Sequence, residues 1–134
     1  MSAIGFTGTQ EGLTKQQTQV LKEALEYYIE LGWHTQFHHG DCIGADREFH
    51  NLAKEYGFYI VLHPPDISTK RAFCSDVRFT YPVKPYLERN HDIVNSSDVL
   101  IVCPKTKEEV IRSGTWATYR YANKLNKSIL LVEP

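Results

Sequence analysis

A glycine turn that begins at His38 carries the residue types best suited to chemistry. The nine residues from this position read HHGDCIGAD, and they lie between a predicted strand at 33–37 and a predicted helix with apolar residues at helical spacing. Because glycine has no Cβ, Gly40 and Gly44 let the backbone turn sharply and let a ligand approach closely. The N-terminus of the helix adds free N–H groups and a partial positive charge. The turn therefore predicts a site for a phosphate-sized anion.

The same turn also has a structural interpretation, in which Asp41 or Asp46 caps the helix and the glycines only make a tight connection. Two further turns of this kind favour a binding site. Thr7-Gly8-Thr9 follows an apolar stretch at 2–6, and Ser113-Gly114-Thr115 precedes the last predicted helix. The first of them lacks the G-x-G-x-x-G spacing of a dinucleotide fingerprint, so that motif is not assigned.

Five apolar stretches alternate with helical patterns along the chain. The predicted strands are 2–6, 33–37, 58–62, 99–103 and 129–132. The predicted helices begin near Thr14, near Ala45, after Pro85 and near Gly114, and Gly32 and Gly57 end the first two. This alternation predicts an α/β fold, a single Rossmann-like three-layer domain over 1–134, with a five-stranded parallel sheet in the order 3-2-1-4-5 and helices on both faces. In such a sheet the glycine turns meet at the carboxyl ends of the strands, where ligands bind.

Composition narrows the function classes. A chain of 134 residues that is 42% hydrophobic and 23% charged suits one soluble domain, and its net charge of −1 does not favour nucleic acid as a partner. No window approaches the roughly 20 apolar residues that a membrane span needs. Three widely spaced cysteines and an N-terminus without a signal-peptide pattern predict a reduced, cytoplasmic protein. A small molecule is the partner that this balance favours.

The segment 64–85 has no sustained period, yet it combines cations with aromatic residues. The cations are Lys70, Arg71, Arg78 and Lys84, beside Phe73, Phe79, Tyr81 and, just beyond the segment, Tyr86. Loops of this length in compact domains are mostly functional or disordered, and this one is too aromatic for disorder. We expect it to close over a ligand as a lid or to contact a second subunit of a homo-oligomer.

A zinc site is the main rival hypothesis for the central turn. His38, His39 and Cys42 lie close together in sequence, with His63 or Cys103 as further ligands. Structural zinc sites usually show two tight ligand pairs, and here there is only one, so neither a metal nor another cofactor is expected. Cys103 ends an apolar strand and is interpreted as a small buried hydrophobe rather than a nucleophile.

Taken together, these pieces resemble the SLOG superfamily of Rossmann-like proteins, especially its small YspA-like members, and more distantly the lonely-guy phosphoribohydrolases. The matching pieces follow the family's order along nearly the whole chain: Phe6-Thr7-Gly8-Thr9, His39 to Asp46, His63-Pro64-Pro65-Asp66, Glu88-Arg89-Asn90, Asp98 to Ile101, and Ser113-Gly114-Thr115. The resemblance implies a pocket for a nucleotide or nucleoside phosphate, AMP-like or ADP-ribose-like, with the phosphate held at Gly114 and Thr115 and at the helix that they open.

The resemblance also implies which residues line the pocket. Arg89 matches an arginine close to the ligand in the hydrolytic relatives, where a guanidinium can hold a ribose phosphate bidentately. A solvated helix face is the other interpretation of this arginine. The expected nucleotide contacts are Thr7, Gly8, Thr9, Gly40, Asp41, Gly44, Ala45, Asp46, Arg89, Asn90, Pro104, Ser113, Gly114 and Thr115.

One departure from the relatives bears on catalysis. The hydrolytic relatives place a glutamate where this chain has Thr118, and departure of a base from ribose needs a carboxylate that threonine cannot replace. Asp41, Asp46 and Arg89 are then the remaining catalytic candidates, with ribose recognition the preferred role for the two aspartates.

Three function classes follow. We favour a module that senses or sequesters a nucleotide signal over a glycosidic-bond hydrolase or deoxyribosyltransferase-like enzyme, and over a DNA-binding or scaffolding protein.

Overall fold

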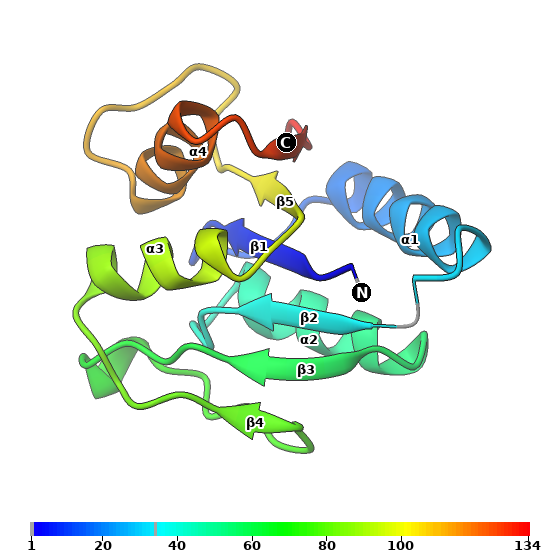
Figure 1. Ribbon diagram of the computed structural model, residues 1–134. Coiled ribbons are helices and arrows are strands. Elements are labelled where there is room, and N and C mark those ends of the chain that lie inside the picture. Colours follow the sequence, from blue (N-terminus) through cyan, green and yellow to red (C-terminus); the bar gives the residue numbers. More distant parts are fainter. Residues whose placement is uncertain (1, 34) are drawn as a thin grey trace.

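The computed structural model describes residues 2–33 and 35–134. Its centre is one sheet of six parallel strands in the order β4-β3-β2-β1-β5-β6 (Figure 1). The strands are β1 (Ile4–Gly8), β2 (Gln36–His39), β3 (Tyr59–Leu62), β4 (Phe79–Thr80), β5 (Val99–Cys103) and β6 (Ser128–Leu131). The helices are α1 (Lys15–Glu30), α2 (Ala45–Glu55), α3 (Tyr86–Asn95) and α4 (Gly114–Lys124), with a 3-10 turn η1 (Ser68–Lys70). The predicted α/β class and Rossmann-like layering are confirmed.

The five predicted strands keep their predicted order, and one more strand is added at an edge. β4 pairs with β3 and comes from the segment that the sequence marked as irregular, because two residues are too few to produce an alternating pattern. The second strand lies at 36–39 rather than at 33–37, since Trp33 stacks on Tyr28 of α1 instead of joining the sheet. His34, which falls within that expected strand, lies outside the described residues.

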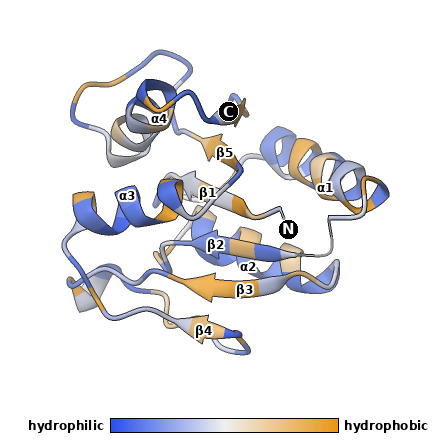
Figure 2. Cartoon of the chain, viewed as in Figure 1, coloured by the Kyte–Doolittle hydropathy of each residue, from blue (hydrophilic) through white to orange (hydrophobic). Residues whose placement is uncertain are grey.

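Helices cover both faces of the sheet, α1 and α2 on one side and α3 and α4 on the other (Figure 1). Successive residues of a strand point to opposite faces, so Ile101 of β5 joins the core under α1 and α2, whereas Val102 joins the core under α3 and α4. Figure 2 shows hydrophobic residues gathered along β3 and β5, while each helix mixes hydrophobic and hydrophilic residues. Among the described helices, none has the length and apolarity that a membrane crossing requires.

Local signals begin and end the helices where predicted. Thr14 and Gln17 form a capping box at the start of α1, in which each side chain accepts a hydrogen bond of 3.0 Å from the other residue's backbone N–H. The buried Nε2 of Gln17 also donates to the carbonyl of Pro104 at 2.9 Å, which joins the start of α1 to the end of β5. Gly32 and Gly57 each have a φ of +84°, the left-handed conformation that favours glycine after a helix.

A pair of buried histidines lies beside the edge of the sheet. His38 Nδ1 and His63 Nε2 are 2.8 Å apart, and the His63 ring stacks on Tyr81. Burial lowers the pKa of His38 to about 4, and burial together with the neighbouring His38 lowers the pKa of His63 to about 3. Both rings are therefore neutral in the folded chain at pH 7.

This pair predicts a loss of stability on mild acidification. Below pH 6.5 the unfolded chain binds a proton on each histidine, whereas the folded chain does not until the pH approaches the lowered pKa values, so stability falls as the pH falls. Each ring should lower the free energy of unfolding by about 1.2 kcal/mol between pH 6 and pH 5. Urea unfolding of the wild type and of His38→Gln at these pH values measures the slope. An equal slope in both proteins would contradict the assignment.

Candidate functional site

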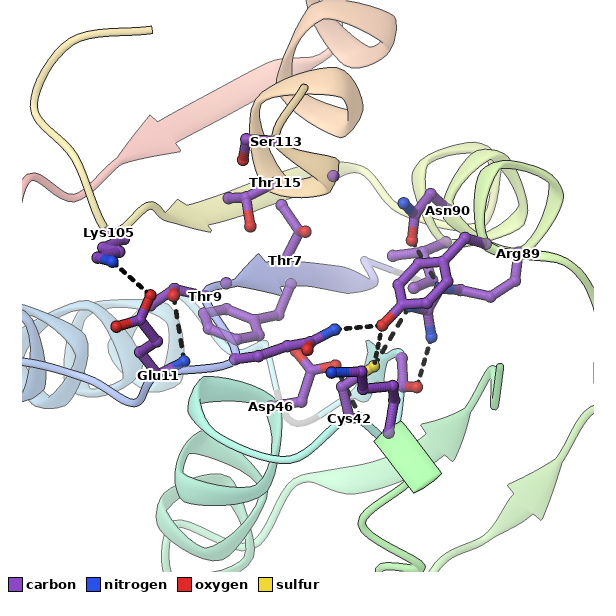
Figure 3. A pocket seen from close by; sticks show the side chains of 18 of the residues that line it. Thr7, Thr9, Glu11, Cys42, Asp46, Arg89, Asn90, Lys105, Ser113 and Thr115 are labelled. Carbon is purple, nitrogen blue, oxygen red and sulfur yellow. Dashed lines mark hydrogen bonds and ion pairs between the residues drawn. The ribbon is translucent and has the colours of Figure 1, made fainter. Parts of the chain in front are cut away.

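A cavity of about 680 Å³ opens at the carboxyl ends of β1, β2 and β5 (Figure 3). This is the edge at which the sequence placed the ligand, and the cavity lies within the range of sizes that small-molecule sites have. Ten of the fourteen expected contact residues line it: Thr7, Gly8, Thr9, Gly40, Asp46, Arg89, Asn90, Ser113, Gly114 and Thr115. The structure therefore brings the three glycine turns together around one space.

Asp41 is one of the four expected residues that do not line the cavity. Its carboxylate is buried and accepts hydrogen bonds from Arg71 Nε at 2.7 Å and from the Cys74 backbone N–H at 2.9 Å. Its own backbone has a φ of +54°, and its carbonyl accepts from Ala72 at 2.7 Å. Asp41 thus anchors the segment 71–74 to the glycine turn, and its oxygens are used inside the protein.

The other three residues outside the cavity wall connect the loops beneath it. Gly44 has a φ of +87°, and a Cβ there would overlap the carbonyl of Gln10. Ala45 donates its backbone N–H to Thr9 at 2.9 Å, so the first and second glycine turns are joined directly. Pro104 is buried, and its carbonyl accepts a hydrogen bond from the side chain of Gln17 in α1. These positions shape the site without facing the ligand space.

The start of α4 forms one end of the cavity. Ser113 is the N-cap, and its hydroxyl accepts a hydrogen bond of 3.2 Å from Trp116 N. The backbone N–H groups of Gly114 and Thr115 have no partner among the described residues, and both residues line the cavity. Lys105 also lines it and lies 2.6 Å from the carboxylate of Glu11, in an exposed ion pair. This end can accept an anion through two free N–H groups, the helix dipole and a nearby ammonium.

Thr118, at the position of the hydrolytic relatives' glutamate, faces away from this end. Its hydroxyl donates to the carbonyl of Gly114 at 2.8 Å, the residue is only 1% exposed, and it does not belong to the cavity wall. The first turns of α4 therefore bring no carboxylate to the cavity.

Arg89 occupies the opposite, buried end of the site. Its guanidinium donates to the carbonyls of Gly40 at 2.5 Å and His63 at 3.0 Å, to Asn90 Oδ1 at 2.6 Å and to Cys42 Sγ at 3.4 Å. Four of its five N–H groups are thus used within the part of the chain that the structure describes, and only one remains for a ligand. The bidentate phosphate clamp inferred from the resemblance would require breaking one of these bonds.

Asp46 lies beside this guanidinium and lines the cavity. Its Oδ2 accepts a hydrogen bond from the Cys42 backbone N–H at 3.1 Å, and the carboxyl group is 5% exposed. Burial raises the pKa of Asp46 to about 6, although the Arg89 charge opposes this shift. The group is therefore mostly ionised at pH 7 and close to titration at pH 6.

Several lining residues were missed by the sequence reasoning. Gln10 donates a side-chain hydrogen bond to the hydroxyl of Tyr86, which also lies 3.4 Å from Cys42 Sγ, and all three residues line the cavity. Ile67 and Lys70, from the segment expected to be a lid, form part of the wall. Gln10 directly follows the first glycine turn, and this position was the one available signal. Tyr86 was noted only as an aromatic neighbour of the lid cations.

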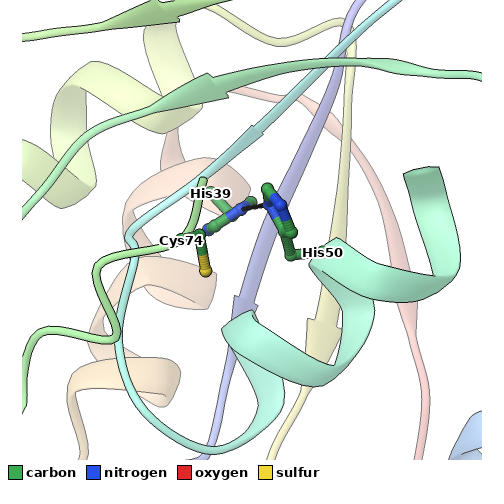
Figure 4. Close-up of side chains that lie close together, drawn as sticks. All are labelled: His39, His50 and Cys74. Carbon is green, nitrogen blue, oxygen red and sulfur yellow. Dashed lines mark hydrogen bonds between the residues drawn. The ribbon is translucent and has the colours of Figure 1, made fainter. Parts of the chain in front are cut away.

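A second group of side chains has the composition of a metal site. His39, His50 and Cys74 place their ligand atoms within 4.8 Å of one another (Figure 4). Hydrogen bonds already use the ring nitrogens: the Asp41 N–H donates to His39 Nδ1, His39 Nε2 then donates to His50 Nδ1, and His50 Nε2 donates to the Ser75 carbonyl, each at 3.0 Å. The donor at one end of this series, the Asp41 N–H, and the acceptor at the other, the Ser75 carbonyl, fix which ring nitrogens carry protons. His39 therefore offers no lone pair to a metal in this arrangement.

Two glycine positions at opposite ends of the cavity make a matched test of these roles. A Cβ on Gly40 would overlap Arg89 Nη1 and lie 2.7 Å from its Cζ, whereas a Cβ on Gly114 meets nothing within 4 Å. Gly40→Ala should therefore lower the free energy of unfolding by about 2 kcal/mol or more, because a buried guanidinium loses partners. Gly114→Ala should leave it unchanged or raise it by up to about 1 kcal/mol. Urea unfolding of both variants gives the comparison, and equal effects would refute the assigned packing.

Compared with family models and with curated protein sequences, the chain matches none. Its fold is similar to solved structures. A molybdenum cofactor binding protein from the phototrophic bacterium Rippkaea orientalis is 21% identical, with a TM-score of 0.73 over 99% of this chain and 77% of that one. The molybdenum cofactor carrier protein from Chlamydomonas reinhardtii is 24% identical, with a TM-score of 0.70 over 100% of this chain and 79% of that one. At these identities the similarity shows that the chain has the Rossmann-like fold of these proteins.

Proposed function

We propose that this chain binds a nucleotide, or a cofactor built like one, and holds it without turning it over. The observation that carries the proposal is the pairing of two ends in one cavity. One end has the unpartnered N–H groups of Gly114 and Thr115, and the other has the buried Asp46, Arg89 and Asn90. A phosphate suits the first end and a hydrogen-bonding head group suits the second.

The charge of the cavity supports an anionic ligand. Three cations line it, Lys70, Arg89 and Lys105, against the two carboxyl groups of Glu11 and Asp46. Lys105 and Lys70 stand at the exposed part of the wall, where their charge can attract and orient a phosphate. A ligand with one or two negative charges fits this balance better than a cation does.

A molybdenum cofactor is the second candidate ligand. Two proteins with the same fold, over nearly the whole of this chain, are named for binding or carrying it. The organic part of that cofactor is a phosphorylated pterin, which like a nucleotide joins a phosphate to a flat heterocycle. The same two-ended cavity therefore suits both ligands.

Membership of the SLOG superfamily, a cytoplasmic location and assembly into homo-oligomers remain predictions.

Two of the other function classes have less support. Hydrolysis needs a positioned carboxylate, and Thr118 is turned away from the cavity. DNA binding would need free cations on the lid segment, but within the described chain Arg71 is paired with Asp41, Arg78 lies over the Tyr59 ring, and Lys84 is paired with Asp92. These charges are used locally rather than gathered in one patch.

The phosphate end can be tested with Gly114→Leu. The new side chain would enter the open space in front of the free N–H groups, so binding of AMP or GMP should weaken at least tenfold while the fold is retained. Asn123→Leu, at an exposed position of the same helix, is the control. Calorimetry measures the affinities, and circular dichroism confirms folding. Unchanged affinity in Gly114→Leu would show that the phosphate lies elsewhere, and a wild type that binds no phosphate-bearing heterocycle would refute the proposed function.

Binding without turnover has its own test. After long incubation with the wild type, the nucleotide should be recovered intact, because the cavity presents no carboxylate from α4. Chromatography of the mixture separates nucleotide from free base. Release of free base by the wild type but not by Asp46→Asn would place the protein among glycosidic-bond hydrolases.

A further inference from the structure

Two polar side chains at the inner end of the cavity each keep one atom without a hydrogen-bond partner among the described residues. Asp46 and Asn90 are each 5% exposed and line the cavity. Asp46 uses Oδ2 and Asn90 uses Oδ1 in hydrogen bonds, whereas Asp46 Oδ1 and Asn90 Nδ2 have no partner among residues 2–33 and 35–134. Every fully shielded side-chain polar atom of the described chain has a partner. The two free atoms therefore face the cavity rather than the core.

Such atoms indicate what a ligand must supply. A ligand that enters the cavity shuts water away from these two atoms, and leaving either of them unpaired then costs about 1–3 kcal/mol, or more for a charged group. An ionised carboxylate only accepts hydrogen bonds, and an amide nitrogen only donates them. The one unused N–H of Arg89 is on Nη2, whose other N–H donates to Cys42 Sγ, and it is a second donor. A matching ligand presents donors to Asp46 and an acceptor to the Asn90 and Arg89 side.

We propose that Asp46 and Asn90 recognise a 2-amino-4-oxopyrimidine edge, the part that guanine and pterin share. This edge presents an amino group and a ring N–H side by side, and the free Oδ1 of Asp46 can accept both through its two lone pairs, next to a carbonyl that the Nδ2 of Asn90 can bind. Adenine has an amino donor but no carbonyl. The inference rests on the proposed function and narrows its ligand to a guanine or pterin head group.

The spacing of the strands agrees with this assignment. Asp46 lies in the first turn of α2, after β2, and the free N–H groups of α4 come after β5, with β1 between the two strands. Two strand spacings amount to about 10 Å. A nucleoside monophosphate spans a similar length from its phosphate to the far edge of its base. Gly40 has no Cβ, and the Arg89 guanidinium lies in the space that a Cβ would occupy, next to Asp46 Oδ2.

The discriminating experiment compares GMP, IMP, XMP and AMP by calorimetry on the wild type and on Asp46→Asn. IMP lacks the 2-amino group of GMP, so the wild type should prefer GMP about tenfold or more. XMP has a carbonyl in place of that amino group. An asparagine can donate to this carbonyl, so Asp46→Asn should weaken GMP and strengthen XMP, reversing their order. Asp66→Asn, at an exposed position, is the control and should change neither.

Two further arms make the result decisive. Asn90→Ala should weaken GMP and IMP by the same factor, since both carry the 6-carbonyl, so the GMP-to-IMP ratio should stay unchanged. Pterin-6-carboxylate separates the two sources of the edge, and binding tighter than that of GMP assigns the site to a pterin. If Asp46→Asn weakens all four nucleotides equally, Asp46 holds the ribose and this inference fails while the proposed function stands. If the wild type binds none of the probes, both fail.

Discussion

A buried guanidinium is the constraint on which the site depends. Arg89 comes from α3, yet its hydrogen bonds run to the carbonyls that follow β2 and β3 and to the sulfur of Cys42. Its positive charge also lies over the ring of Tyr86, 4.6 Å from the centroid. A charge removed from water must be well partnered to be tolerated. The ends of two strands, the glycine turn and α3 are therefore held in one geometry by a single side chain.

The cavity draws on both sides of the sheet, because Arg89 and Asn90 of α3, on the same face as α4, share the inner end with Asp46. Asp46 belongs to α2 on one face, and the free N–H groups of Gly114 and Thr115 belong to α4 on the other. They meet above β1, where the strand order reverses: β2, β3 and β4 lie on one side of β1, and β5 and β6 lie on the other. The topology thus brings side chains and backbone groups from both helical layers to one cavity.

Much of this arrangement was predictable from the sequence, because the signals are local. Thr14, Gly32 and Gly57 bound helices by their own backbone chemistry, and the apolar run of β5 indicates a strand buried on both faces. The glycine turns, together with the family resemblance that supplied Arg89 and Asn90, predicted ten of the residues that line the cavity.

What the sequence could not show depends on distant partners. Asp41 and Asp46 lie in the same turn and are the same residue type, but Arg71 and Cys74, 30 and 33 residues away, take up the oxygens of Asp41. Asp46 lacks such partners and keeps one oxygen for the cavity. β4 was missed for a similar reason, since a strand of two residues exists only because β3 offers it an edge.

The pairing of β1 with β5 has a consequence for synthesis of the chain. β1 lies inside the sheet, but Val99 of its partner strand β5 follows Ile4 by 95 residues, and the Ala3 N–H donates to a carboxylate that is equally distant in sequence. Contacts this distant in sequence slow folding and leave strand edges open in the meantime. On the ribosome the first strand made is among the last to be completed, so the nascent chain carries an unpaired apolar edge until β5 has emerged.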